Sequence, residues 1–397
     1  MPGFFVACFL GFLFYNRYVD DYQKLQALSK ASELEAGEDG CRLATREKER
    51  GIILTRARMS NGRSTSLLKS LLNSACENNC LYCPMRAGRD FQRHAFLPDE
   101  FARLVINLTN AGLIQGVFLS SGVSGGGVRT QDRLIDTAQL LRKKYQYQGY
   151  LHLKIMPGAE DDQVAACLGL ANRVSINLEA PNEKRLPVLA PQKDFNSQLM
   201  RPMQRIAEFR RNTAPVSAWK GKWPSICTQF VLGAAGETDR ELLETTQSLH
   251  RDYLLSRAYF SAFTPQEDTP LAHHPSVPLR RELRLYQADF LIRDYGFNQE
   301  DMVFDRQGHL PLNIDPKIAW AERHLAGLPV EINRASKEEL LRVPGIGPKS
   351  ANRIMEARRV RAIRDFSGLG KLGVNARRAA AYILLDGRAP ARKMRLF

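Results

Sequence analysis

Residues 74–86 read SACENNCLYCPMR and carry three cysteines, Cys76, Cys80 and Cys83, with the spacing C-x3-C-x2-C. The stretch directly follows an apolar, β-prone run at Leu67–Asn73. Three thiolates this close together on a loop can each bind one iron of a cubane cluster. One iron of the cubane then has no protein ligand, and an open position of this kind is what a catalytic metal centre needs.

A zinc site is the alternative for these cysteines, with a fourth ligand such as His94, and chance clustering is another. Zinc ligands usually come as two C-x2-C pairs, and a second pair is absent here. The seven cysteines of the chain are an odd number with one tight cluster, which does not resemble a disulfide framework. Metal ligation in a reducing compartment fits better. The other cysteines are scattered: Cys8, Cys41, Cys167 and Cys227.

Outward from the cysteines, short apolar runs alternate with helix-like stretches. The expected strands are Leu67–Asn73, Gly116–Ser120, Tyr150–Ile155, Arg173–Leu178, Ile226–Leu232 and Arg257–Ala262. The expected helices are Pro98–Gly112, Gln131–Tyr147, Ala159–Leu170, Asp194–Asn212, Glu237–Arg251 and Leu279–Tyr295. Such alternation predicts a parallel sheet with right-handed crossovers, which can curl into an open barrel with ligands at the carboxyl ends of its strands. We therefore expect an α/β fold, a partial (βα)6 TIM-like barrel, over residues 63–310.

The cysteine spacing, the aromatic Tyr82 before the third cysteine and the place after the first strand resemble the radical S-adenosylmethionine (SAM) superfamily. The resemblance covers roughly residues 64–300. It implies that Cys76, Cys80 and Cys83 hold a [4Fe–4S] cluster whose open iron binds SAM, with Tyr82 among the cofactor-binding residues. It also implies reductive cleavage of SAM to a 5′-deoxyadenosyl radical that abstracts hydrogen from a substrate, and an electron donor such as flavodoxin or ferredoxin. Catalytic side chains for the substrate stay unassigned.

Two turns made of small residues resemble SAM-binding positions of the superfamily. Ser120 and Ser121 stand where many members have Gly-Gly-Glu, and small residues there let the backbone approach closely. Gly233 begins a turn similar to the G-x-I-x-G-x-x-E region, whose backbone lies beside the adenine. A plain glycine-rich loop and an ordinary strand-to-helix turn are the respective alternatives.

The fourth expected strand carries polar residues where a buried parallel strand is normally apolar. Ser175, Asn177 and Glu179 alternate along it and therefore point to one face. Buried polar groups need partners, which the ribose and aminoacyl group of SAM would supply. The strand resembles those of the biotin- and lipoyl-synthase-like members, which implies that Asn177 and Glu179 contact SAM. The alternative is that Glu179 caps the strand end near solvent.

Other charged residues near the expected strand ends have two interpretations each. Lys154 could meet substrate or the SAM carboxylate, or extend toward solvent as lysines often do. Arg86, Arg89 and Arg93 could steer an anionic substrate toward the cluster, or bind the cysteine loop itself.

The C-terminal residues 331–397 form a basic module. They hold 16 Lys and Arg against 6 acidic residues, which is +10 of the chain's net charge of +15. The VPGIGPK segment, residues 343–349, sits between two short predicted helices and is similar to the helix-hairpin-helix motif of DNA-repair and replication proteins. A degenerate second copy follows at residues 368–383. We expect a small all-α, tandem helix-hairpin-helix domain.

This domain is expected to bind DNA through its phosphates. A helix N-terminus with glycine-exposed backbone N–H groups suits phosphate, without sequence readout. A protein–protein docking domain of the same fold is the alternative. The predicted phosphate contacts are Gly345, Ile346, Gly347, Lys349 and Ser350.

The two segments that flank the expected barrel are predicted to be a leader and a linker. Residues 1–62 are predicted to be a partly helical or disordered leader, and the proline-punctuated residues 311–330 to be a linker. The apolar run Phe4–Tyr15 is too short to span a bilayer, and no Lys or Arg precedes it as in a signal peptide. We expect no stable membrane insertion and a cytoplasmic location.

The pairing of a radical SAM barrel with a helix-hairpin-helix domain resembles a bacterial family of radical SAM proteins named for DNA modification or repair. The resemblance implies an enzyme that acts on DNA. Two alternatives stay open: a radical SAM enzyme acting on RNA or a small molecule, and a non-catalytic iron–sulfur protein that binds nucleic acid.

Overall fold

The computed structural model describes residues 21–32, 46–49, 52–58 and 64–389. Two compact units are present: one extends to residue 237 and includes residues 249–277, and the other comprises residues 238–248 and the chain from residue 278. The apolar run at residues 4–15 lies outside the described residues. Of the helices in the described part of the chain, none has the length and apolarity that crossing a membrane requires.

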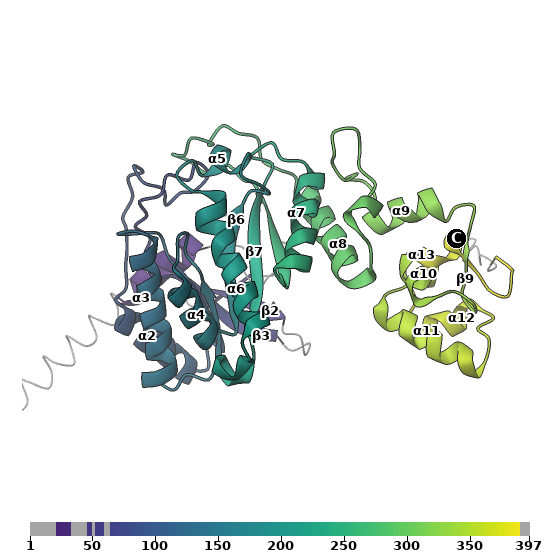
Figure 1. The fold of residues 1–397 in the computed structure, drawn as a ribbon, viewed down its shortest axis with the longest axis horizontal. Coiled ribbons are helices and arrows are strands. Elements are labelled where there is room, and N and C mark those ends of the chain that lie inside the picture. The colour runs from purple at the N-terminus through teal and green to yellow at the C-terminus, as the bar shows by residue number, and fades with distance from the viewer. Residues whose placement is uncertain (1–20, 33–45, 50–51, 59–63, 390–397) are drawn as a thin grey trace, which may run out of the picture. The chain divides into compact units, whose positions relative to one another are not determined.

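An eight-stranded sheet in strict chain order forms the core of the first unit (Figure 1). Its first strands, β1 (Arg46–Glu49) and β2 (Ile52–Arg58), are antiparallel to their neighbours, and the six that follow are parallel. The parallel strands are β3 (Ser64–Leu71), β4 (Gly116–Ser120), β5 (Tyr150–Lys154), β6 (Arg173–Glu179), β7 (Ser225–Leu232) and β8 (Arg257–Ala262). The predicted α/β fold with a partial (βα)6 barrel is confirmed.

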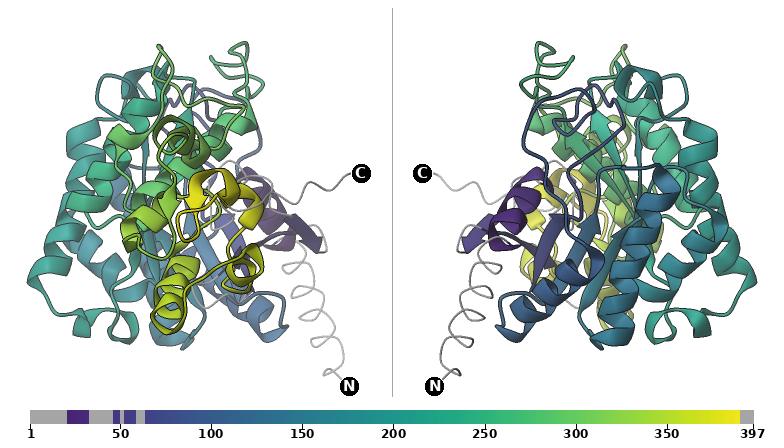
Figure 2. Two further views of the ribbon diagram at one scale, coloured as in Figure 1. Left: turned by 90° about the vertical axis from the view of Figure 1, so that its right-hand side faces the viewer. Right: turned by 90° about the vertical axis from the view of Figure 1, so that its left-hand side faces the viewer.

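Helices in the crossovers line the outer face of the curved sheet, as Figures 1 and 2 show. They are α2 (Pro98–Asn110), α3 (Gly127–Gln139), α4 (Asp161–Leu170) and α6 (Arg201–Asn212). The short helix α5 (Leu186–Leu189) follows β6, and α7 (Asp239–Asp252) follows β7 and begins in the second unit. Two π-helical segments, η2 (Leu140–Lys144) and η3 (Phe195–Met200), adjoin α3 and α6. Helix α2 illustrates why they form: Phe101, Leu104, Val105 and Leu108 recur at helical spacing and are buried.

The leader predicted for residues 1–62 contributes to the sheet. No strand is predicted there, because the apolar part of β2, Ile52–Leu54, is short and flanked by charged residues. A helix at residues 21–32 lies beside this edge of the sheet (Figure 2), with Leu25 and Leu28 fully buried. The Ser32 hydroxyl donates to a carbonyl of β3, that of Lys69, at 3.1 Å.

The second unit is built from short helices around its own apolar core. They are α8 (Leu279–Tyr295), α9 (Pro316–His324), α10 (Lys337–Arg342), α11 (Pro348–Val360), α12 (Phe366–Lys371) and α13 (Ala376–Ala379). A two-stranded parallel pair, β9 (Val330–Glu331) and β10 (Ile383–Leu384), closes it. The expected linker at residues 311–330 contains α9 instead, because Asp315 caps that helix and Pro316 opens it. Ala321 and Leu325 join the same core as Ile332.

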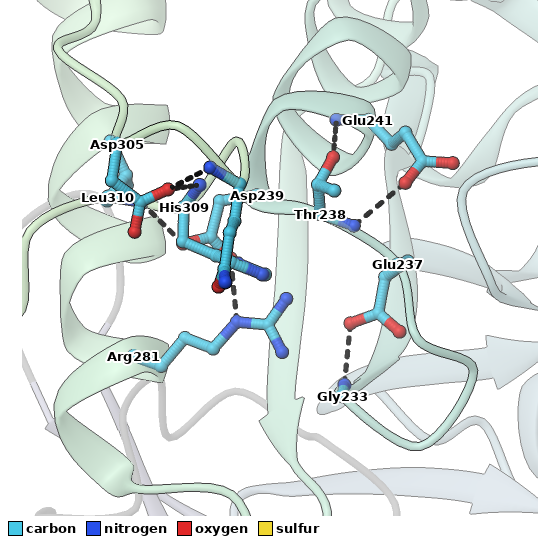
Figure 3. A network of polar contacts seen from close by, with 10 residues as sticks. Gly233, Glu237, Thr238, Asp239, Glu241, Arg281, Asp305, His309 and Leu310 are labelled. Atoms are coloured by element: carbon cyan, nitrogen blue, oxygen red, sulfur yellow. Dashed lines mark hydrogen bonds and ion pairs between the residues drawn. The ribbon is translucent and has the colours of Figure 1, made fainter.

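Asp239, the first residue of α7, joins three segments of the second unit (Figure 3). Its side chain is fully buried, and its Oδ1 accepts a hydrogen bond from Arg281 Nε of α8 at 2.7 Å. Its Oδ2 accepts from the Leu310 N–H at 2.8 Å, and His309 Nδ1 lies 3.7 Å from Oδ1. The Asp305 carboxylate accepts from the His309 N–H at 2.9 Å and so orders the same loop. One buried carboxylate therefore fixes this loop against α7 and α8.

The side chain of Lys317 in α9 is hydrogen-bonded to the turn between α10 and α11. Lys317 is 7% exposed. Its Nζ donates to the Ile346 carbonyl at 2.6 Å and lies 4.5 Å from the centroid of the Tyr295 ring. Burial lowers the pKa of Lys317 to about 7; Asp315 opposes this shift and Arg378 adds to it.

Replacing the buried carboxylate should cost much of the stability of this unit. We expect Asp239→Ala to lower the free energy of unfolding by roughly 3–5 kcal/mol, because Arg281 loses its buried counter-ion. Denaturant unfolding followed by circular dichroism measures the change. As a control, Asp294→Ala removes an exposed partner of Arg293 on α8 and should cost less than about 1 kcal/mol. A loss of that size for Asp239→Ala would contradict the assignment.

Stability should also rise with pH because of Lys317. The folded pKa is about 7 and the unfolded lysine keeps its ordinary, higher value, so between them the unfolded chain binds one more proton. We expect the free energy of unfolding to increase by roughly 1–3 kcal/mol from about pH 7 to pH 9 through this group. Lys317→Met should remove the increase, whereas Lys337→Met, at an exposed position, should keep it. If the free energy of unfolding increased with pH equally in the wild type and in Lys317→Met, the role of Lys317 would be refuted.

Candidate cofactor site and helix-hairpin-helix module

The loop that carries the three cysteines connects β3 to α2 without regular structure and is held by backbone hydrogen bonds. The Cys83 N–H donates to the Cys80 carbonyl at 3.2 Å, which makes a tight turn. The Leu81 N–H between them donates to the Leu189 carbonyl at 2.7 Å. The turn is therefore fixed to the segment that follows β6.

Arg93 holds the rest of this loop together. Its Nη1 donates to the carbonyls of Ser74 and Met85 at 3.0 and 3.1 Å. Its Nη2 donates to those of Arg86 and Arg89 at 3.0 and 3.1 Å. Arg86 and Arg89 also donate to oxygens of the same loop. Of the two interpretations of these arginines, the structure shows the second: they bind the cysteine loop.

The glycine-rich loop after β4 interlocks with the cysteine loop. The Glu77 carboxylate accepts from the N–H groups of Gly125 and Gly126 at 3.0 and 2.9 Å. A Cβ at Gly122 would lie only 2.5 Å from the Ala75 carbonyl oxygen, so only glycine allows this approach. The close backbone approach at Gly122 is therefore made to the cysteine loop.

A pocket at the carboxyl ends of β3 to β6 brings most of the predicted site together. Cys76, Cys80 and Cys83 all line it. Of the predicted cofactor-binding residues, the pocket lining also includes Tyr82, Ser121, Asn177 and Glu179. Ser120 is fully buried behind this lining. Gly233 is not part of it, and its N–H donates to Glu237 Oε1 at 2.5 Å (Figure 3).

Glu179 is buried in this pocket, which excludes the alternative of a solvent-facing strand cap. Its side chain is 3% exposed, and its backbone has φ 64°, in the left-handed region. A residue other than glycine keeps this conformation only where its surroundings enforce it. The pairing of β6 with β7 shifts register between Asn177 and Glu179, which re-aims the side chain. Oε1 accepts from Lys193 Nζ at 3.0 Å, and Oε2 has no hydrogen-bond partner among the described residues.

Lys193 and Lys154 also line the pocket. Lys154 is 6% exposed, so it does not extend into solvent. Lys193 was not singled out from the sequence, since it stands in an irregular, polar segment with no motif. Only the fold brings it beside Glu179 and the cysteines.

The electrostatics of the pocket couple these groups. Burial raises the pKa of Cys83 to about 12 and also raises that of Cys80, where the Lys193 charge opposes the shift. Burial and then the charge of Glu179 raise the pKa of Tyr82. Burial alone would lower the pKa of Lys193, but the negative charges of Cys80 and Glu179 raise it above its ordinary value. Thiolates here therefore need nearby positive charge, such as a metal or a lysine supplies.

The residues fit a three-cysteine cluster with SAM. In the part of the chain that the structure describes, no three His, Cys, Asp or Glu side chains gather around a single ion. The unpartnered Glu179 Oε2 suits a polar ligand beside the cluster.

The helix-hairpin-helix segment forms as the sequence predicts. Ser336 and Glu339 make a capping box at the start of α10. Gly345 has φ 88°, and a Cβ there would lie 2.5 Å from the Asn375 carbonyl oxygen. The Asn375 N–H in turn donates to the Gly345 carbonyl at 2.9 Å. The second, degenerate copy of the hairpin therefore packs directly on the first.

The predicted phosphate-binding residues differ in how exposed their side chains are. Lys349 is exposed in the first turn of α11, and Gly347 is the N-cap of that helix. Ile346 is buried in the core of the second unit. Ser350 is buried as well, and its hydroxyl donates to the Gly373 carbonyl at 2.8 Å. The side chains of Ile346 and Ser350 thus stabilise the paired hairpins, and phosphate contacts there would come from the backbone.

Comparison with known protein families agrees with the radical SAM resemblance of the barrel and with the helix-hairpin-helix resemblance of the C-terminal segment. The family model of the radical SAM superfamily matches residues 71–249, and that of the helix-hairpin-helix motif matches residues 326–375. No curated protein matches the sequence.

Three solved structures are similar to part of this chain. The FeFe-hydrogenase maturase HydG from Carboxydothermus hydrogenoformans is 13% identical, with a TM-score of 0.45 over 57% of this chain and 51% of its own. Methylornithine synthase (PylB) is 15% identical, with a TM-score of 0.43 over 57% and 62%. The radical SAM methyltransferase TsrM from Kitasatospora setae is 14% identical, with a TM-score of 0.36 over 52% and 38%.

The chain spans about half the length of the HydG chain that it matches. Residues 71–249 therefore form a radical SAM domain, of a family of enzymes that use a [4Fe–4S] cluster and SAM as cofactors, and a helix-hairpin-helix motif follows this domain.

Proposed function

We propose that this enzyme cleaves SAM reductively and acts on DNA, in modification or repair. The pocket in which three cysteines meet buried polar residues at the strand ends carries the first part of the proposal. The helix-hairpin-helix motif, in the segment that holds +10 of the net charge, supports the second.

In this proposal Cys76, Cys80 and Cys83 ligate the cluster. When bound, the cluster supplies one electron to SAM, and the resulting 5′-deoxyadenosyl radical removes hydrogen from the substrate. Asn177 and Glu179 orient SAM through hydrogen bonds. Met156 and Leu199, which also line the pocket, help to exclude water.

In this proposal, the remaining predicted SAM-binding residues contact SAM in or close to the same pocket. Tyr82 and Ser121 lie in its lining and can donate hydrogen bonds. Ser120 and Gly233 would act through their backbone at the ends of β4 and β7, because Ser120 is not part of this lining and Gly233 has no side chain.

The C-terminal module would hold DNA by its phosphates. Gly345, Ile346, Gly347 and Ser350 would offer backbone N–H groups around the start of α11, and Lys349 an exposed ammonium. Contacts of this kind carry no sequence readout. An electron donor such as flavodoxin or ferredoxin would supply the electron, and the reducing cytoplasm would keep the unpaired cysteines free for the metal.

Loss of one proposed ligand should abolish the cluster. We expect anaerobically reconstituted Cys76→Ala to bind almost no iron and to lack the visible absorbance of an iron–sulfur centre. The matched control is Cys167→Ala, which removes a buried thiol on α4 outside the pocket and should keep the iron of the wild type. Iron content and absorbance measure the outcome, and full iron retention by Cys76→Ala would reject the ligand assignment.

The proposal as a whole is tested by the formation of 5′-deoxyadenosine from SAM by the reduced protein, with and without duplex DNA. We expect product that increases with DNA. Lys349→Met should raise the DNA concentration for half-maximal stimulation by about fivefold at physiological salt, because one phosphate contact is lost. Lys337→Met, at an exposed position on the neighbouring helix, serves as the control.

Other outcomes point to the alternatives. Product that responds to RNA alone, or to neither polymer, would keep the radical chemistry and reject DNA as the substrate. No product from protein with an intact cluster would support a non-catalytic iron–sulfur protein.

A further inference from the structure

Lys193 is a buried cation in the cofactor pocket to which no role has been given. Its side chain is 9% exposed, and its Nζ lies 3.0 Å from Glu179 Oε1. The segment that carries it is fixed to the cysteine loop: the Asn79 N–H donates to Gln192 Oε1 at 2.8 Å. The lysine therefore has a defined position beside the proposed iron ligands.

The position of Lys193 gives its charge a strong effect on the cysteines. The side chains of Lys193 and Glu179 are buried, and a charge acts more strongly where the effective dielectric constant is low. Lys193 lines the same pocket as Cys76, Cys80 and Cys83, and Glu179 Oε1 holds its ammonium at 3.0 Å.

Reduction adds one negative charge to an iron–sulfur cluster. A fixed positive charge nearby stabilises the reduced state more than the oxidised state and raises the reduction potential, and a negative charge lowers it. We propose that Lys193 is a positioning residue whose charge raises the reduction potential of the cluster on Cys76, Cys80 and Cys83, with Glu179 as the opposing charge. This inference rests on the cluster assignment in the proposed function.

The experiment is a potentiometric titration of the full-length, reconstituted protein without SAM, followed by the paramagnetic resonance signal of the reduced cluster. We expect Lys193→Met to shift the midpoint potential to lower values and Glu179→Gln to shift it to higher values. Lys193→Arg keeps the charge and should stay close to the wild type. Lys184→Met removes an exposed lysine from the same segment, and its effect should be screened by solvent.

An unchanged midpoint potential in Lys193→Met would overturn the inference. If Lys193→Met does not retain iron, Glu179→Gln decides: a higher potential supports the inference, and an unchanged or lower one overturns it. The readout needs neither SAM cleavage nor DNA. Absent potential shifts together with normal SAM cleavage would therefore reject only this inference, whereas a wild-type protein without a cluster would reject it together with the proposed function.

Discussion

The hydrogen bonds that fix the cysteine loop to the carboxyl end of the sheet are the constraint on which the site depends. A loop without regular structure would otherwise leave its carbonyl groups unpaired. Arg93 satisfies four of these carbonyls, and Glu77 binds the glycine-rich loop after β4. Because parallel strands end at one edge of a sheet, the loops that follow β3, β4 and β6 can interlock there.

Burial of charge is the second constraint, and it follows from the first. Two charged side chains are buried beneath the interlocked loops, and buried charged groups persist only as partners. Glu179 and Lys193 satisfy this condition by pairing, and the left-handed backbone of Glu179 shows that the fold, not local preference, sets its direction. The pair leaves one carboxylate oxygen for a ligand. A buried site of this kind supplies fixed charges that need no rearrangement when a ligand binds.

The second unit obtains its stability in a different way. Apart from α8 and α11 its helices are short, and few of them would be stable alone in water. Tertiary contacts compensate: Asp239 joins α7, α8 and a loop, Lys317 supports the hairpin, and Ser350 joins the two hairpin copies. These buried groups leave Lys349 exposed at the start of α11, so packing and the proposed phosphate contact use different side chains.

Local patterns in the sequence were enough to predict the fold class, the cysteine loop and the helix-hairpin-helix motif, because each depends on spacing along the chain. The bounds of β4 and β8 follow from their apolar runs, which end at loop residues. The bulge at Glu179, the approach of Lys193, the strands β1 and β2 and the docking of α9 were decided only by the tertiary structure. They depend on contacts between residues far apart in the chain, which periodicity and propensity do not encode.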